Sequence, residues 1–205
     1  MKLFRTYLMA LCFAMLFACG AGNEDKRDTM EDAEHFEPIN GDVVENDDEN
    51  SEASLTAIAN IASASGSKLT GKATFRQQED GKVKFELEVK NAKPGQHAVH
   101  LHENGDCSAA DASSAGGHWN PTNTKHGKRG EGEFHKGDIG NMEVGNDGNG
   151  SMEMTVEGWS IGGAKDSNIL NKAVIVHAGA DDFTSQPSGA AGAMIGCGVI
   201  KQGVE

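Results

Sequence analysis

The stretch Lys82-Val-Lys-Phe-Glu-Leu-Glu-Val-Lys90 alternates apolar and charged residues without a break. Because successive side chains of a β-strand point to opposite faces, this period of two predicts a strand with one buried face and one face in solvent. Glu79-Asp80-Gly81 directly precedes it and is a turn signal, which predicts a hairpin with the segment Leu69–Gln77. This part of the chain is therefore predicted to be an antiparallel β-hairpin.

Short segments of the same kind continue on both sides of this hairpin, separated by long Gly-rich connections at 103–135 and 178–195. About eight antiparallel strands in roughly 150 residues predict an all-β sandwich or flattened barrel. Loops of that length in a compact domain are usually functional or tied down. The remaining predicted strands cover Leu55–Ala62, Gln96–His102, Ile139–Glu143, Ser151–Val156, Ala173–His177 and Gly196–Lys201.

The composition agrees with a β-domain and restricts its partners. Among 205 residues there are 27 glycines, which weaken helices and serve tight turns. A hydrophobic content of 37% is too low for a multi-pass membrane protein. The net charge of −13 argues against a nucleic-acid partner, because phosphate recognition needs a basic face.

Most of the negative charge lies near the N-terminus. Residues 20–52 carry thirteen acidic residues and a net charge of −11, whereas residues 53–205 carry a net charge of −4. Apolar residues are too sparse in this acidic segment to offset the entropy lost on ordering. Residues 20–53 are therefore predicted to be a disordered linker, with His35 a solvated bystander.

The first nineteen residues have the organisation of an export signal. A basic start is followed by the apolar run Tyr7–Phe17, which is too short to span a bilayer. Leu16-Phe17-Ala18-Cys19 resembles the lipobox of bacterial lipoproteins, in which the cysteine is lipidated, although Phe17 is bulkier than that motif usually allows. We expect a lipoprotein signal peptide at 1–19, a tether at 20–53 and the functional domain at 54–205. The alternative is plain signal-peptide cleavage at another position.

Four cysteines divide according to this organisation. Cys12 lies in the signal and Cys19 is the expected anchor, so Cys107 and Cys197 remain in the exported domain. Two thiols in an oxidising compartment suggest one disulfide. It would close a loop of about 90 residues, for which the chain-entropy model gives about 4.6 kcal/mol of stabilisation. The alternative is two unpaired buried thiols.

Histidines are concentrated at the predicted loops. Seven of the eight lie between positions 97 and 177. In His100-Leu101-His102, the two imidazoles of a strand would point to one face about 6.6 Å apart, so both can converge on one ion while Leu101 faces the core. Taken alone, the pair is a weak indication, because surface or hydrogen-bonded core histidines give the same pattern.

A second set of candidate ligands lies on the first long loop. His118, His126 and His135, together with Asp138, supply three imidazoles and one carboxylate. This is a complete tetrahedral ligand set for zinc. His177, at the end of an apolar run, adds a nitrogen donor for a second, nitrogen-rich site that suits copper.

Five motifs cover most of the predicted domain. They are Gly95-Gln-His97-Ala-Val-His100-Leu-His102-Glu-Asn-Gly105-Asp106-Cys107, Ser114-Ala-Gly-Gly-His118-Trp-Asn-Pro121 with His126-Gly127, His135-Lys-Gly-Asp138-Ile-Gly-Asn141, His177-Ala-Gly-Ala-Asp181-Asp182 and Gly196-Cys197-Gly198-Val199-Ile200. In order and spacing, over about residues 55–201, they resemble the copper/zinc superoxide dismutases. The chain is especially similar to the exported bacterial branch, which places a Cys directly after the Gly-Asp pair.

The resemblance implies an eight-stranded antiparallel Greek-key sandwich or flattened barrel with long metal-binding loops. It implies that superoxide is converted to oxygen and hydrogen peroxide at a copper that cycles between two oxidation states, with His118 as a proton donor. The implied copper ligands are His100, His102, His118 and His177, and the implied zinc ligands are His118, His126, His135 and Asp138, with His118 shared.

The resemblance also assigns supporting roles. Cys107 and Cys197 match the family's disulfide, which ties the 103–135 loop to the barrel. Asp181 matches a carboxylate that links a copper ligand to a zinc ligand and fixes imidazole tautomers. His97 matches a histidine that binds no metal, so a structural hydrogen-bonding role is expected for it.

One position departs from the family pattern. Met194 stands three residues before Cys197, where the family has an Arg. The 178–195 loop contains no Lys or Arg, and Asp181 and Asp182 are its only charges. We therefore expect slower catalysis than in relatives that keep the Arg. A cation that guides superoxide would have to come from Lys125, Lys128, Arg129, Lys136 or Lys172.

The favoured function is a lipid-anchored superoxide dismutase at the periplasmic or outer face of a bacterial envelope, either a monomer or a homodimer. The alternative is a copper- and zinc-binding lipoprotein whose dismutase activity is only residual. The complete ligand set favours the enzyme, because a metal carrier does not need a shared His118.

Overall fold

The structure is a computed structural model that describes residues 55–203. The predicted signal peptide, the lipidated Cys19, the acidic linker and His35 lie outside the described residues. Within the described range, no helix is long and apolar enough to cross a bilayer.

All eight predicted strands are present, with ends within two residues of the expected positions. The last predicted strand is interrupted at Ile200, so it appears as two strands in succession. The long 103–135 connection contains a single 3₁₀ turn, Ser113–Ala115. The strands are β1 Thr56–Ser63, β2 Thr70–Gln77, β3 Val83–Lys90, β4 Gly95–His102, β5 Asp138–Val144, β6 Gly150–Val156, β7 Ala173–His177, β8 Met194–Val199 and β9 Lys201–Gln202.

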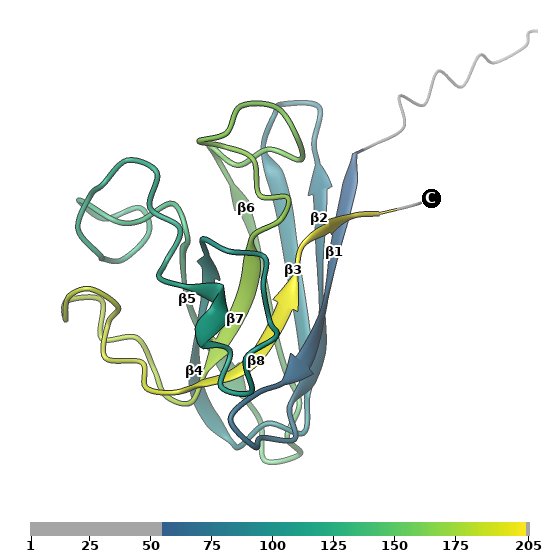
Figure 1. Cartoon of the computed structure of the whole chain (residues 1–205), viewed down its shortest axis with the longest axis vertical. Helices are drawn as coiled ribbons and strands as arrows, with labels where there is room; N and C mark the ends of the chain where they lie inside the picture. The colour runs from purple at the N-terminus through teal and green to yellow at the C-terminus, as the bar shows by residue number, and fades with distance from the viewer. Residues whose placement is uncertain (1–54, 204–205) are drawn as a thin grey trace, which may run out of the picture. The chain divides into compact units, whose positions relative to one another are not determined.

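The strands form a closed antiparallel barrel (Figure 1). Their order around the barrel is β2-β3-β6-β5-β4-β7-β8-β1, and pairing between β1 and β2 closes the ring, while β9 continues alongside β1. The pairing of β3 with β6 and of β4 with β7 requires connections that cross over intervening strands, as in a Greek key. The predicted fold class is confirmed.

The alternating segment that predicted the first hairpin forms β3. Its four apolar side chains are completely or almost completely buried, and Phe85 stands opposite Phe75 of β2 and Met154 of β6. Phe75, Phe85 and Trp159 form an aromatic cluster with ring centroids 5.1 to 6.1 Å apart. Burial of each such side chain stabilises the fold by about 1.5–3 kcal/mol. The turn is also as expected, with Gly81 at φ 80°.

Strand β4 is buried on both faces, unlike β3. Leu101 packs in the main core, whereas His100 and His102 point away from it and are themselves 0% and 4% exposed. The 103–135 loop, which carries His118, His126 and His135, and the 178–195 loop, which carries Asp181, project from the same side of the barrel (Figure 1). The barrel therefore holds His100 and His102 in place, and the loops bury their side chains.

Candidate metal centre

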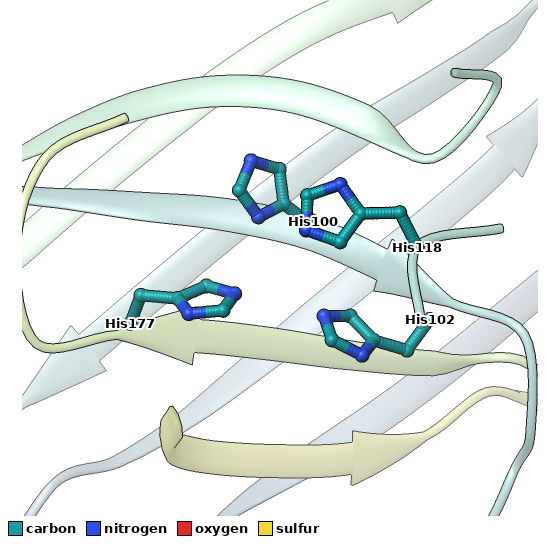
Figure 2. Close-up of side chains that lie close together, drawn as sticks. All are labelled: His100, His102, His118 and His177. Carbon is teal, nitrogen blue, oxygen red and sulfur yellow. The ribbon is translucent and has the colours of Figure 1, made fainter. Parts of the chain in front are cut away.

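Four histidines from three parts of the chain converge beside β4 (Figure 2). His100 and His102 lie on β4, and His177 is the last residue of the neighbouring strand β7. His118 is brought beside His102 by an isolated antiparallel β-bridge. That bridge is held by the next residue, since Trp119 N–H donates to the carbonyl oxygen of Leu101 at 2.8 Å.

Each of these four imidazoles has one buried ring nitrogen without a hydrogen-bond partner. They are Nδ1 of His100 and Nε2 of His102, His118 and His177. The four residues offer ligand atoms that lie within 4.8 Å of one another, and all four side chains are buried. An unpaired buried polar atom is costly, so four of them converging on one point indicate a site built for a ligand.

Hydrogen bonds at the opposite ring nitrogen fix which atom faces this point. His100 Nε2 donates to the Asp181 carboxylate at 2.8 Å, and His102 Nδ1 donates to the carbonyl of Gly116 at 2.7 Å. His177 Nδ1 donates to the carbonyl of Gly192 at 3.2 Å. Since a neutral imidazole carries one proton, these bonds leave the lone pair on the inward nitrogen.

Burial keeps these rings neutral. Loss of water, followed by the proximity of other imidazoles, lowers the pKa of His102 and of His177 to about 3. Burial also lowers the pKa of His100 to about 4, although its hydrogen bond to Asp181 works in the opposite direction. At neutral pH the inward nitrogens of His100, His102 and His177 are therefore unprotonated, as a metal ligand must be.

A second group of ligands lies on the other side of His118. Oδ1 of Asp138 is 2.8 Å from Nδ1 of His118 and 3.4 Å from Nδ1 of His135. Oδ2 of Asp138 is 3.0 Å from Nδ1 of His126. The two ring nitrogens of His118 therefore belong to different groups. Its Nδ1 lies in the second group, and its Nε2 is one of the four unpaired nitrogens of the first group.

The carboxylate at the centre of the second group stays ionised. Burial alone would raise the pKa of Asp138, but the hydrogen bond from His118 and the backbone N–H of His135 lower it well below its usual value. Burial lowers the pKa of His135. The group thus offers three imidazoles and one anionic oxygen, the donor set predicted from the sequence.

Asp181 joins the two groups. Its Oδ2 accepts from His100 Nε2 at 2.8 Å, and its Oδ1 accepts from His126 Nε2 at 2.9 Å. Asn141 of β5 holds the main chain of Asp181: the Asn141 amide donates to Asp181 O, and Asp181 N donates back to the Asn141 amide oxygen. Asn141 stood in a quoted motif without an assigned role, so sequence reasoning missed its contribution.

Arg129 supports the second ligand group through contacts to the main chain. Its guanidinium lies over the rings of Phe134 and Trp159 and donates to the carbonyls of Asp138 and Lys136. Burial lowers the pKa of Arg129 to about 10, which leaves it cationic at neutral pH. From the sequence alone, the structural role of Arg129 could not be distinguished from that of the nearby surface lysines.

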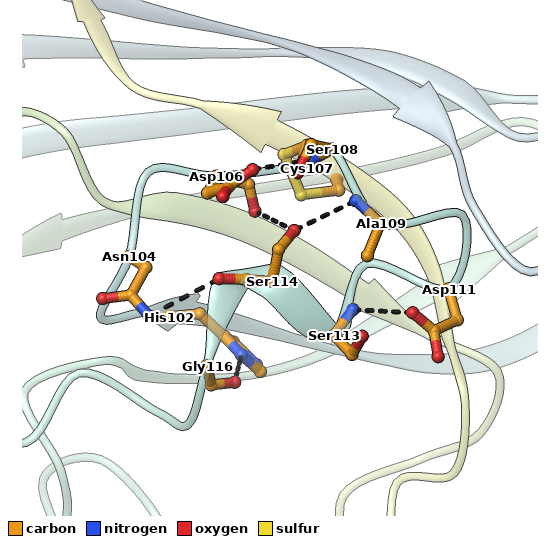
Figure 3. The surroundings of a disulfide bond; sticks show 11 residues. His102, Asn104, Asp106, Cys107, Ser108, Ala109, Asp111, Ser113, Ser114 and Gly116 are labelled. Atoms are coloured by element: carbon orange, nitrogen blue, oxygen red, sulfur yellow. Dashed lines mark hydrogen bonds between the residues drawn. A yellow bond between two sulfur atoms is a disulfide. The ribbon is translucent and has the colours of Figure 1, made fainter.

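The predicted disulfide is present between Cys107 and Cys197 (Figure 3). It ties the start of the 103–135 loop to β8. Around it, Ser114 Oγ donates to Asp106 O at 3.0 Å and accepts from Ala109 N. The same loop segment presents the Gly116 carbonyl that orients His102.

His97 has the structural role expected of it. Its Nδ1 lies 2.7 Å from the carbonyl of His177, and its Nε2 lies 2.8 Å from the carbonyl of Lys93. It belongs to neither metal-ligand group, and it ties β4 to the end of β7.

A cavity of about 560 Å³ opens above the first ligand group. Met194 lines it together with His102, His118 and His177. The position at which the sequence carries Met in place of the Arg of the resembled family pattern therefore faces the cavity. Lys125 also lines it, whereas Lys128, Lys136 and Lys172 do not. Those three lysines are engaged elsewhere, with Glu131, the carbonyl of Asp166 and the carbonyl of Glu103 respectively.

Comparisons with known proteins agree with this geometry. Residues 69–200 match the family described as copper/zinc superoxide dismutase (SODC). The chain is 35% identical over 151 residues to superoxide dismutase [Cu-Zn] 1 of Aquifex aeolicus, covering 72% of this chain and 88% of that protein. It is 36% identical over 146 residues to superoxide dismutase [Cu-Zn] of Caulobacter vibrioides, covering 69% and 83%.

A solved structure, a double mutant of a superoxide dismutase-like protein from Bacillus subtilis, has the same fold. It superimposes with a TM-score of 0.63 at 34% identity and covers 69% of this chain and 95% of that one. Relatives named as dismutases and a relative named only as dismutase-like are thus about equally similar to this chain.

Proposed function

Because this chain belongs to the copper/zinc superoxide dismutase family, we propose that it converts superoxide to oxygen and hydrogen peroxide at a centre holding copper and zinc. The observation that carries the proposal is the set of four buried ring nitrogens without partners, converging beside a second group of three imidazoles and one carboxylate. Four nitrogens suit copper, and the mixed group suits zinc.

The residues present fit both ions. Copper would be held by His100 through Nδ1 and by His102, His118 and His177 through Nε2, the atoms that otherwise have no partner. Zinc would be held by Nδ1 of His118, His126 and His135 and by Asp138. His118 is the shared residue, since its two ring nitrogens face different groups.

When bound, copper supplies one-electron redox chemistry. The chain contributes fixed geometry, because Asp181, Gly116 O and Gly192 O lock the tautomers of three ligands. It also contributes a proton site: Nε2 of His118 faces the cavity side and can take up and release a proton there. The buried rings restrict water to the cavity, which a small anion can enter.

The alternative, a metal-binding protein with residual dismutase activity, is favoured by one observation. Met194 is uncharged, and among the residues lining the cavity Lys125 is the only Lys or Arg. Dismutase turnover per bound copper, measured on the fully metallated domain of residues 54–205, separates the two functions. We expect rapid turnover that requires all four ligands of the first group. Turnover per bound copper that stays near the level of the metal-free domain would support the alternative.

Replacing Met194 with arginine is expected to raise the second-order rate constant for superoxide by about tenfold at low salt. Focused positive potential accelerates association of an anion, and the gain declines as salt screens it. Pulse radiolysis over a salt series measures both effects. Met194→Leu, at equal copper occupancy, is the uncharged control. An unchanged rate and an unchanged salt slope in Met194→Arg would show that Lys125 already supplies the guiding charge.

We further propose that the protein is exported and lipid-anchored through Cys19, with residues 20–53 as a tether. The Cys107–Cys197 disulfide supports export, because disulfides persist in oxidising compartments. If Cys19 carries the acyl chains, Cys19→Ser is expected to leave an unprocessed precursor or to release the domain into the soluble exported fraction. Detergent partitioning of the mature forms measures this. Equal partitioning with normal processing would mean that cleavage occurs elsewhere.

A further inference from the structure

The 178–195 loop holds the candidate zinc ligand His126 at two places. Asp181 accepts a hydrogen bond from its ring at 2.9 Å. Five residues further along, the side chain of Gln186 contacts the main chain of the same residue. Its Nε2 donates to His126 O at 2.9 Å, and its Oε1 accepts from His126 N at 3.0 Å. Ring and main chain of His126 are therefore both held from a distant segment of the sequence.

This double hydrogen bond requires a side-chain amide. Only Asn and Gln carry a donor and an acceptor side by side, as a peptide group does. His126 lies between β4 and β5 outside any strand, so no sheet ladder serves its peptide groups. Gln186 takes the place of a neighbouring strand at this residue.

The loop is also shaped to lie close against His126. A Cβ at Gly189 would collide with Oδ1 of Asp181 and would lie 2.7 Å from Nε2 of His126. Gly189 has φ +69° and is held by a hydrogen bond from its N–H to Ser185 O at 2.7 Å. The segment from Ser185 to Gly189 thus covers the Asp181–His126 hydrogen bond, and Gln186 is its side-chain attachment to the first long loop.

We propose that Gln186 is a positioning residue that holds the main chain of His126 and so slows the release of zinc from the second ligand group. The inference rests on the proposed function, since it takes zinc as the ion at that group. A ligand whose main chain is clamped cannot swing away without breaking two further hydrogen bonds. Gln186 also lines the cavity, so zinc at His126 would reciprocally order that part of the cavity wall.

The first test measures zinc release. Wild type, Gln186→Met and Gln186→Glu are loaded with zinc alone, and transfer of zinc to an excess of a coloured chelator is followed over time. Gln186→Met keeps the length but loses both bonds, and we expect release about tenfold faster, as for other residues that orient metal ligands. Gln186→Glu keeps only the acceptor and should fall between. Gln202→Met, an exposed glutamine on β9, is the matched control and should match wild type.

The second test needs no metal. Hydrogen exchange at the His126 amide should be faster in metal-free Gln186→Met than in wild type, and Gln186→Glu should retain protection because its carboxylate still accepts from that N–H. Equal zinc release and equal His126 exchange in wild type and Gln186→Met would overturn the proposal. Equal acceleration at amides of β3 would also overturn it, since that indicates general loosening. If wild type itself retains no zinc, the proposed zinc site fails, while the His126 exchange still reports on Gln186.

Discussion

His118→Ala is expected to lower copper-dependent dismutase activity and zinc affinity together, each by at least about 100-fold. Residues that merely orient metal ligands are worth about 10- to 100-fold, and His118 is placed to be a ligand on both sides. Its Nε2 is one of the four unpaired nitrogens of the first ligand group, and its Nδ1 lies 2.8 Å from Oδ1 of Asp138. Metal analysis after dialysis, together with a superoxide assay, measures both losses.

His135→Ala provides the comparison for this result. Its Nδ1 lies in the second group only, 3.4 Å from Nδ1 of His118. It should lose zinc to a similar degree while keeping the four nitrogens of the first group and most of the copper. His35→Ala, in the acidic segment, should behave as wild type. Intact zinc affinity and full turnover in His118→Ala would refute the assignment of this residue to both ions.

Removal of the disulfide by the double change Cys107→Ser and Cys197→Ser is expected to lower the free energy of unfolding by about 2–4 kcal/mol, less than the about 4.6 kcal/mol of the chain-entropy model, because measured effects commonly fall short of that model. The bond closes a long loop, with a sequence separation of 90, and so restricts the unfolded chain strongly. For a domain of this size the melting temperature should fall by roughly 5–15 °C. Calorimetry or chemical denaturation of the metal-free domain measures the change without a contribution from bound ions.

The disulfide should also matter for the first ligand group. The loop segment that it ties to β8 presents the Gly116 carbonyl, which accepts from His102 Nδ1 at 2.7 Å (Figure 3). The serine variant is therefore expected to bind copper more weakly as well as to unfold more easily. Wild type treated with a reductant is the control and should show the same melting temperature as the variant. A variant as stable as oxidised wild type would contradict the loop-closure argument.

Much of the fold was predictable because its signals are local. The alternation in 82–90 follows from the two faces of a strand, and it correctly placed four apolar side chains in the core. The Glu79-Asp80-Gly81 turn was predictable because Gly81 supplies the positive φ that the hairpin needs. The interruption at Ile200 was not predicted, because nothing in residue type distinguishes a continuous strand from two strands in register with the same neighbour.

The sequence by itself determined which residues could bind metals, because few side chains carry the required donors and most of the chain's histidines cluster in one region. Only the tertiary structure decided how they are held. It determined which ring nitrogen faces each ligand group, and it placed the guanidinium of Arg129 over the rings of Phe134 and Trp159. It also brought Asn141 and Gln186 to the main chains of Asp181 and His126. These contacts are made to backbone groups, which every residue possesses, between positions 40 and 60 residues apart, so no local pattern of residue types could encode them.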